Sequence, residues 1–479
     1  MIQQRSQLQK SSQAGLVCSP GGQGSPAAVG CRRVAARTSK QRYVCGRGEL
    51  QITASLIRRD DVHTVTKLPK PIPRDSIRLG LPSKGRMAED TMQLLKDCAL
   101  SVYKPNPRQY VAKIPQIPGV EIPGVEVWFQ RASDVVRKLR LGDIDLGIVG
   151  YDMFQEIGDG DSGSSSGGRG DIDLGIVGYD MFQEIGDGDS DLVVVHEALG
   201  FGHCHLALGV PMGGKFANVN NLEQLRAMDC WTEETPLRVV TGYHAIAKRF
   251  FDQAGFEHVA LLTADGALEA APAMGCADII LDLVSTGVTL KENNLREIEG
   301  GRIVDSQGVL VANRRSLTER PQQLLPVLHE LLERLDAHLK AEQFYSVIAN
   351  MRGESPEAVA TLLMQQEGLR GLQGPTISPV YSLDGSASGA AAKHGFYACV
   401  ICVAKKNLYP SVKALQKIGG SGVLVQPMTY IFDEEPLRWQ RLLAQLGIDE
   451  AAAGNDPAAA AAVLASNGAA AQEAAPARR

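Results

Sequence analysis

The stretch that decides the fold is ADIILDLVSTGVTL, residues 277–290. Its first half is an apolar run with the length of a buried β-strand, and its second half is a short loop of hydroxyl residues and glycine. The polar segment that follows, LKENNL, can begin a helix. A strand that ends in such a loop predicts an α/β sheet, because these sheets bind their ligands at the carboxyl ends of the strands.

This loop has the chemistry of a phosphate site. Backbone N–H groups at a helix start, with the hydroxyls of Ser285, Thr286 and Thr289, can surround a phosphate, and glycine at 287 allows a close approach. The carboxylates of Asp282 and Glu269, just upstream, can hold ribose hydroxyls or a magnesium ion. The loop lacks the GxxxxGK[ST] pattern of a P-loop, and a plain helix cap is the alternative explanation.

Strands and helices alternate on both sides of this stretch. Strands are expected at residues 77–82, 126–130, 192–199, 203–210, 237–242, 277–284 and 302–312, and in DLGIVG. Helices are expected at residues 85–100, 132–141, 244–255, 266–275 and 321–339. This order predicts a mainly parallel α/β sheet between Ile77 and about Asn350.

A smaller unit follows. Helices at 355–366 and 408–419 and strands at 375–383, 396–404 and 421–432 predict a small α+β module. From Ala451 onward 15 of 29 residues are alanine, interrupted by glycine, proline and asparagine. We expect a disordered tail there, at most with a frayed helix.

Charge is distributed unevenly over the 479 residues, whose formal net charge is −5. Residues 1–48 hold eight Lys or Arg and no acid, which is typical of an organellar transit peptide, with an ordinary disordered tail as the alternative. The remainder carries 41 basic and 54 acidic side chains, so nucleic-acid binding is disfavoured. No apolar run has the length of a membrane span, so a membrane partner is not expected either.

A duplication interrupts the α/β region. Residues 142–162 (GDIDLGIVGYDMFQEIGDGDS) recur letter for letter as residues 170–190. Diverged structural repeats do not stay identical over 21 residues, and a solenoid needs at least three stacked units, so this is not a repeat architecture. We interpret it as a recent duplication or an error of gene prediction, with one copy folded and 28 residues looped out.

Cations lie at several strand and helix ends. Lys84 and Arg86, in the segment SKGR, follow the first strand and open a helix, where positive charge is unfavourable unless an anion binds. Arg108 and Arg131 also lie at loop or strand ends. An acidic chain with cations at these places predicts a highly phosphorylated ligand.

Two other pairs of side chains are assigned no site. His203 and His205 share a strand face and are able to bind a metal, but a packed or hydrogen-bonded role is the stronger interpretation. Cys399 and Cys402 alternate along a strand and point to opposite faces, which favours core packing over a redox or zinc site.

Together these motifs resemble the long-form ATP phosphoribosyltransferases of plants and algae. The resemblance covers about Ile77 to Ile448 and rests on PSKGRM (82–87), NPRQY (106–110), FQRASDVVRKL (129–139), DLGIVGYD (145–152 and 173–180), ALGFGHCHLA (198–207), the block 263–295, GPTISPVY (374–381) and IGGSGVLV (418–425). It implies a glycosyltransferase that, with Mg2+, condenses ATP through N1 with 5-phosphoribosyl-1-diphosphate. The products are 1-(5-phosphoribosyl)-ATP and pyrophosphate, in the first step of histidine biosynthesis.

The family implies a bilobed catalytic core resembling type II periplasmic binding proteins and a C-terminal ACT-like, ferredoxin-like domain that binds L-histidine as feedback inhibitor. It also implies a plastid location, with the mitochondrion as alternative, and a homo-oligomer, dimer to hexamer. On this chain we expect a transit peptide at 1–48, lobe I at 77–198 and 305–350, lobe II at 199–304, the regulatory domain at 353–450 and the tail at 451–479.

Residue roles follow from the family motifs. The phosphoribosyl diphosphate is assigned to Asp282, Ser285, Thr286, Gly287, Val288 and Thr289. ATP and pyrophosphate are assigned to Lys84, Gly85, Arg86, Arg108, Gly178 and Asp180, the last two with Gly150 and Asp152 as alternatives. The candidate catalytic residues are Arg131, Glu269 and Asp282, of which the two acids are also the candidate magnesium ligands. The family motifs assign no histidine-site residues.

Other functions stay open at this point. A bilobed sensor of a phosphorylated metabolite would share the fold, since fold does not determine function. A different phosphoribosyltransferase or an ATP-using ligase is a further alternative. The combination of both acids, the phosphate loop and all four cations favours the enzyme, because a sensor has no need of a pyrophosphate clamp.

Overall fold

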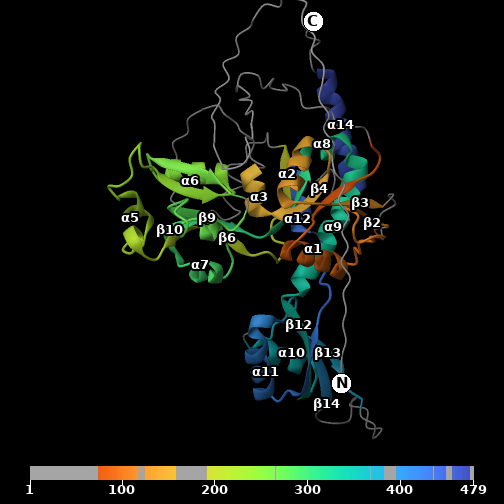
Figure 1. Ribbon diagram of the computed structural model, residues 1–479. Helices are drawn as coiled ribbons and strands as arrows, with labels where there is room; N and C mark the ends of the chain where they lie inside the picture. The colour runs from red at the N-terminus through yellow and green to blue at the C-terminus, as the bar shows by residue number, and fades with distance from the viewer. Residues whose placement is uncertain are drawn as a thin grey trace, which may run out of the picture. The chain divides into compact units, whose positions relative to one another are not determined.

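The computed structural model describes residues 74–115, 117, 124–157, 191–264, 266–366, 368–381, 395–434, 436–448 and 456–474. These residues form two α/β lobes and a C-terminal domain, each with its own sheet (Figure 1). The expected leader at 1–48 and the second copy of the duplicated segment lie outside the described residues. Among the described helices, none has the length and hydropathy that crossing a membrane requires.

Lobe I is built on a six-stranded sheet in the order β2-β3-β1-β4-β11-β5. Its strands are β1 (Arg78–Pro82), β2 (Val111–Ile114), β3 (Val125–Gln130), β4 (Leu146–Gly150), β5 (Leu192–His196) and β11 (Gly308–Asn313). Its helices are α1 (Arg86–Asp97), α2 (Ala132–Leu141), α3 (Tyr151–Ile157), α8 (Arg314–Glu319) and α9 (Pro321–Ala341).

Lobe II is built on a five-stranded sheet in the order β10-β6-β9-β7-β8. Its strands are β6 (Cys204–Pro211), β7 (Leu237–Thr241), β8 (Val259–Thr263), β9 (Ile279–Val284) and β10 (Leu295–Ser306). Its helices are α5 (Leu222–Arg226), α6 (His244–Gln253) and α7 (Val288–Glu292), with 3-10 turns η2 (Gly214–Phe216) and η3 (Leu268–Ala270).

Both sheets are mixed, which corrects the expectation of a mainly parallel sheet. In each lobe one strand, β1 or β7, has a parallel neighbour on either side. The chain crosses from β5 to β6 and returns from β10 to β11, and each crossing strand pairs antiparallel with the core of the sheet that it enters. The strand expected at 302–312 is therefore two strands in different sheets, which separate at Gln307.

Without the additional edge strand β2, the two sheets have the same strand order. Leaving aside the strand by which the chain enters from the other lobe (β11 or β6), the strands of each lobe are counted in chain order. Across each sheet the order is then second, first, third, the entering strand, and finally the strand from which the chain leaves the lobe (β5 or β10). The order is β3-β1-β4-β11-β5 in lobe I and β8-β7-β9-β6-β10 in lobe II. The two lobes therefore present their βα loops at equivalent places.

The C-terminal domain has the β-α-β-β-α-β order of a ferredoxin-like fold. Its elements are β12 (Phe344–Gly353), α10 (Pro356–Met364), β13 (Thr376–Pro379), β14 (Gly395–Ala404), η4 (Lys405–Asn407), α11 (Leu408–Lys417) and β15 (Ser421–Pro427). The antiparallel sheet has the order β13-β14-β12-β15. Strand β12 pairs with β14 along its whole length, so this domain begins at Phe344 and not at 353, inside the range expected for lobe I.

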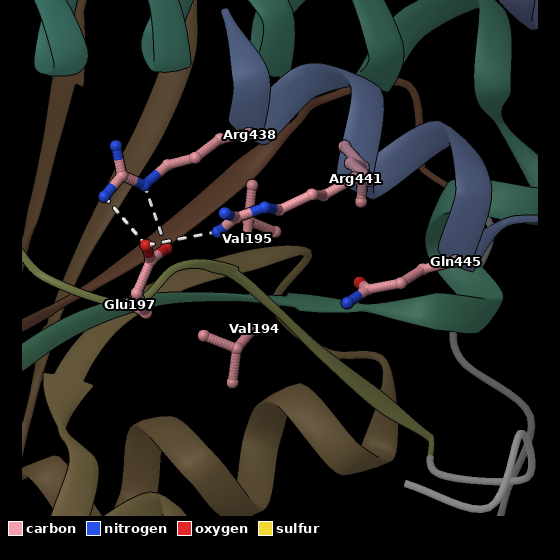
Figure 2. Close-up of a pocket in the computed structure, with 7 residues that line it drawn as sticks. Val194, Val195, Glu197, Arg438, Arg441 and Gln445 are labelled. Atoms are coloured by element: carbon pink, nitrogen blue, oxygen red, sulfur yellow. Dashed lines mark hydrogen bonds and ion pairs between the residues drawn. The ribbon is translucent and has the colours of Figure 1, made fainter. Parts of the chain in front are cut away.

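The chain then returns to lobe I. This return was not expected, because residues 353–450 were assigned to the regulatory domain and residues 451–479 to a tail. Helix α12 (Leu437–Gln445) buries Trp439 and Leu442 in the lobe I core, although 353–450 was expected to belong to the regulatory domain. Figure 2 shows how it is held: Glu197, after β5, accepts two hydrogen bonds of 2.8 Å from the Arg438 guanidinium. Burial raises the pKa of Glu197, but the hydrogen bonds from Arg438, a backbone hydrogen bond and the charge of Arg438 together outweigh it and lower the pKa overall.

The expectation of a disordered tail was wrong for residues 457–474. They form helix α14 (Pro457–Ala474), in which Ala460, Ala461 and Leu464 are buried in the lobe I core. Alanine has the highest helix propensity, and its small side chain allows α14 to pack closely. Asp456 caps the helix by accepting from the Ala458 N–H at 2.9 Å, and Pro457 follows at the first helical position, where proline is favoured.

The helix expected at 266–275 is also wrong, because only the 3-10 turn η3 forms there. Ala267, just before η3, has a left-handed backbone (φ 52°), and Gly275 has φ 73°. Both conformations are incompatible with a continuous α-helix through this stretch. The result is a short turn that carries Glu269 beside strand β9.

Candidate active site

The phosphate loop lies at the carboxyl end of β9, as the sequence predicts. Ser285 and Thr286 are exposed and lead to Gly287, whose φ of 69° is the left-handed conformation that favours glycine. Gly287 precedes α7 directly, and no side chain caps this helix, so its first backbone N–H groups are available to a ligand. Val288 and Thr289 are exposed in the first turn of α7, and the Val288 side chain is 52% exposed.

Two of the predicted acids lie near this loop. Asp282 is partly buried on β9 and accepts a hydrogen bond of 2.8 Å from the Leu283 N–H. Burial raises the pKa of Asp282 to about 6, and the negative charges of Glu269 and Asp152 contribute. Asp282 forms no ion pair with any cation among the residues that the structure describes. The arrangement is therefore a group of carboxylates that a cation would stabilise.

On lobe I, the predicted cations gather at the carboxyl ends of β1 and β3. These strands pair in parallel up to Pro82 and Gln130, and the Ser83 N–H donates to the Gln130 carbonyl at 2.8 Å. The chain after Ser83 and the exposed Arg131 are thereby brought to the same edge.

Both segments begin helices. Gly85, with φ 76°, precedes α1, whose first residue is the exposed Arg86, and Lys84 is exposed just before it. Arg131 precedes α2 directly. Cations at helix N-termini oppose the helix dipole, so these guanidinium groups are placed to meet an anion and not to stabilise the helices.

Arg108 reaches the same edge through the loop before β2. The Phe129 N–H donates to the Tyr110 carbonyl at 2.8 Å, which ties this loop to the end of β3. Arg108 is exposed. Lys104 was not predicted as a site residue, because nothing in its local sequence marks it. Its ammonium lies 4.4 Å from the centre of the Phe129 ring and adds a further positive charge.

The GYD turn of the duplicated segment is formed by the first copy. Gly178 and Asp180 lie outside the described residues, and Gly150 and Asp152 occupy the end of β4 and the start of α3. A Cβ at position 150 would lie 2.3 Å from Asp152 Oδ1, so glycine is required by the close approach of this carboxylate. The G-x-D spacing is thus explained by packing within the turn.

Asp152 is 4% exposed, and both of its carboxylate oxygens accept hydroxyl hydrogen bonds. Ser306 Oγ donates to Oδ1 at 2.6 Å, and Tyr243 Oη donates to Oδ2 at 2.8 Å. Burial and the Asp152 charge raise the pKa of Tyr243 well above its usual value. Sequence reasoning missed Tyr243 and Ser306, because they lie 91 and 154 residues from Asp152 and belong to no local motif.

The structure gives the surroundings of three of the residues that were assigned no site. His205 Nε2 lies 2.7 Å from Glu297 Oε2, which is a hydrogen-bonded role. Cys399 is buried and Cys402 partly buried on alternate faces of β14, and both are free thiols. Among the described residues, no three His, Cys, Asp or Glu side chains are close enough to form a metal site.

Fold and site together define a two-lobed α/β protein with a hydroxyl and acidic edge on one lobe, a basic edge on the other, and a C-terminal β-α-β-β-α-β domain. Two family models match the chain: ATP phosphoribosyltransferase over residues 168–337, and HisG, C-terminal domain, over residues 341–430. The first match begins with the second copy of the duplicated segment, whereas the structure folds the first; the copies are identical in sequence.

Close relatives cover most of the chain. ATP phosphoribosyltransferase 1, chloroplastic, of Arabidopsis thaliana is 52% identical over 81% of this chain and 87% of the relative. ATP phosphoribosyltransferase 2, chloroplastic, of the same plant is 54% identical over 78% of this chain and 82% of the relative. The ATP phosphoribosyltransferase of Gemmatimonas aurantiaca is 29% identical over 73% of this chain and 97% of the relative. The chain belongs to the ATP phosphoribosyltransferase family, a family of transferases of histidine biosynthesis.

Proposed function

We propose that the chain joins its substrates at the carboxyl ends of the strands of both lobes. The bond between the anomeric carbon of 5-phosphoribosyl-1-diphosphate and its pyrophosphate breaks, and a bond from that carbon to N1 of ATP forms. The proposal is carried by one observation: two sheets with the same strand order bear opposite chemistry at the carboxyl ends of their strands. The hydroxyl residues follow β9, with Asp282 inside that strand and Glu269 on η3 beside it, and the cations follow β1 and β3.

Lobe II holds the phosphoribosyl group in this proposal. The N–H groups and hydroxyls from Ser285 to Thr289 surround the 5-phosphate, and the left-handed Gly287 turns the backbone towards it. Asp282 and Glu269 accept hydrogen bonds from the ribose hydroxyls. Their negative charge also favours the positive charge that develops on the ribose ring as pyrophosphate leaves.

Lobe I holds the phosphates of ATP and the leaving pyrophosphate. Lys84, Arg86, Arg108 and Arg131 are exposed at one edge, so they are free to turn towards an anion. Their contribution is largest in the transition state, when negative charge grows on the departing oxygen. Gly85 allows the backbone N–H groups of the first turn of α1 to approach the same phosphates.

A magnesium ion fits the acids of lobe II. Mg2+ usually binds to one or two protein carboxylates and completes its shell with water and substrate phosphates, so Asp282 and Glu269 suffice without a third ligand. The raised pKa of Asp282 reflects burial first and the negative charges of Glu269 and Asp152 second, and a nearby cation would favour its charged form. When bound, the ion would neutralise charge on the pyrophosphate.

The shared strand order of the two lobes supports a type II periplasmic-binding-protein-like core. The ferredoxin-like sheet of the C-terminal domain supports an ACT-like module, and we infer that it binds L-histidine as feedback inhibitor. The family also implies a homo-oligomer, dimer to hexamer. The Arabidopsis relatives are named chloroplastic, which together with the basic, acid-free leader at 1–48 supports a plastid location.

The test is a direct assay of the purified full chain. Incubation with ATP, 5-phosphoribosyl-1-diphosphate and Mg2+ should produce the ultraviolet change of an N1-substituted adenine, and omission of either substrate should abolish it. Substrate binding without product would support the sensor instead. Product formation that histidine does not reduce would contradict the regulatory assignment while leaving the transferase in place.

A further inference from the structure

Helix α3 of lobe I and helix α6 of lobe II make a contact that the proposed chemistry does not use. The side chain of Met153, on α3, packs against the apolar cores of both lobes. Beside it, the Tyr243 hydroxyl of lobe II donates to the Asp152 carboxylate of lobe I over 2.8 Å, and both groups are buried. The two lobes therefore share a packed apolar contact and a buried hydrogen bond.

The start of α6 depends on lobe I. Tyr243, the residue before the helix, supplies no side-chain cap, and the first turn of α6 contains no acid. The cap comes from Glu156 on α3, whose two carboxylate oxygens accept from the Ala245 N–H at 2.9 Å and the Ile246 N–H at 3.0 Å. A carboxylate at this place satisfies two free donors and complements the helix dipole. Lobe II thus has a helix whose cap is available only while lobe I is in contact.

A second side chain of α6 reinforces the contact. Arg249 donates to the Gln155 carbonyl of α3 at 3.1 Å, near the end of α3, where the helix dipole favours a cation. In the described part of the chain, two crossings, after β5 and after β10, link the lobes covalently, and Ser306 at the second crossing donates to the other oxygen of Asp152. Asp152 therefore connects the crossing strands with this contact.

We infer that Asp152, Glu156 and Tyr243, with the amides of Ala245 and Ile246, form a latch that holds the two lobes in their substrate-binding arrangement. These three are positioning residues, because they keep the phosphate loop of lobe II and the basic edge of lobe I at a fixed position relative to each other. The inference rests on the proposed function, in which one substrate pair contacts both lobes. Loss of the latch reduces the fraction of molecules in the binding arrangement, and the apparent affinity for both substrates falls by that fraction.

The kinetic signature is specific. Bound substrates bridge the lobes themselves, so saturation restores the arrangement that the latch provided. Glu156→Ala should raise the KM for both substrates roughly threefold to tenfold, the range expected for loss of a helix cap, and leave kcat within about a factor of two. Tyr243→Phe should also raise both KM values, because it removes the hydroxyl that donates a hydrogen bond to Asp152.

The experiment measures initial rates of the full chain with Glu156→Ala, with the same change in the second copy (Glu184→Ala), with both, and with Glu223→Ala as control. Glu223 is an exposed acid in the first turn of α5, away from lobe I. We expect Glu156→Ala and the double variant to raise both KM values, and the other two to match the unsubstituted chain. An effect in the double variant alone supports a latch that either copy can supply.

Hydrogen exchange separates this inference from the proposed function. The amides at the start of α6 should exchange faster in Glu156→Ala, and saturating ATP with 5-phosphoribosyl-1-diphosphate should restore their protection. Unchanged KM values and unchanged exchange in the double variant would overturn the latch, as would a lower Tm with unchanged KM values. An unsubstituted chain that forms no product would overturn the proposed function instead, and the exchange of α6 would still decide whether the latch exists.

Discussion

The two lobes have the same strand order and opposite chemistry. After the first and second strands of lobe I the chain carries exposed cations, including Lys84, Arg86 and Arg131. After the third strand of lobe II the loop carries hydroxyls, and Asp282 lies within the strand itself. The chemistry that distinguishes the two lobes is carried by a few residues at or near the strand ends, as is general for functions placed on a common scaffold.

The largest effect is expected when positive charge is removed from the basic edge of lobe I. Arg131→Ala should lower kcat about 10²- to 10³-fold, because the cation meets charge that appears in the transition state. The Tm should change little, since Arg131 is exposed and has no ion pair among the described residues. Arg137→Ala, an exposed arginine on the outer face of the same helix, is the matched control, and equal loss of activity in both would mean that the basic edge is misplaced.

The second prediction concerns the helices that pack on lobe I. Among the described residues, only lobe I receives helices from the C-terminal part of the chain, α12 and α14, and Leu464 of α14 is 6% exposed in its core. Leu464→Ala should lower the free energy of unfolding by about 2–4 kcal/mol in urea titrations. Leu437→Ala, which truncates a leucine that is 67% exposed, should change it by less than about 0.5 kcal/mol. Similar values for the two variants would show that α14 does not contribute to the core.

A smaller effect is expected at the phosphate loop. Thr286→Ala removes one neutral hydroxyl from a site that keeps its backbone N–H groups, so the KM for 5-phosphoribosyl-1-diphosphate should rise roughly tenfold. The KM for ATP should change much less, because lobe I holds its phosphates. Thr318→Ala, an exposed threonine on α8, serves as control. A rise in the KM for ATP alone would exchange the roles of the two lobes.

The smallest predicted effect is a pH dependence at Asp282. Its pKa is raised from 3.8 to about 6, so the folded state binds the proton more tightly than the unfolded state. The free energy of unfolding should therefore fall as the pH rises from 3.8 to about 6 and change no further from this group above that. Asp282→Asn should abolish this slope and be relatively more stable above pH 6 in thermal melts.

Glu269→Gln provides the control for this titration. It removes a like charge that contributes to the raised pKa of Asp282, so the sloping window should move to lower pH. A window that stays in place would mean that burial alone determines the pKa.

Local patterns predicted the elements that place the chemistry. The helix expected at 132–141 has those bounds in the structure, because Val135, Val136 and Leu139 form its buried face and Gly142 ends it with a left-handed backbone. The strand and loop from 279 to 287 were likewise predicted from an apolar run followed by hydroxyls and glycine. These features depend on residues that are neighbours in the sequence.

Most of the wrong or missing predictions concern features that depend on residues distant in the sequence. The split of residues 302–312 into β10 and β11 depends on which sheet each half joins, and the hydrogen bonds to Asp152 come from residues far away in the chain. The helix α14 was missed for a different reason: its alanine content was interpreted as low complexity, although Asp456 and Pro457 form a recognisable helix start.

The way in which the C-terminal domain is attached has a mechanical consequence. The chain leaves lobe I at the end of α9 and comes back beside it, where the Ile431 N–H donates to the Ala337 carbonyl at 2.9 Å and His338 Nδ1 lies 3.2 Å from the Thr429 carbonyl. Lys340 also pairs with Asp433 on the returning segment. A domain on a single linker can rotate freely, but here helix α9 and the returning residues 429–433 both connect the domain to lobe I and are bonded to each other. We therefore expect that a rotation of the C-terminal domain relative to lobe I would strain the contacts between α9 and this returning segment.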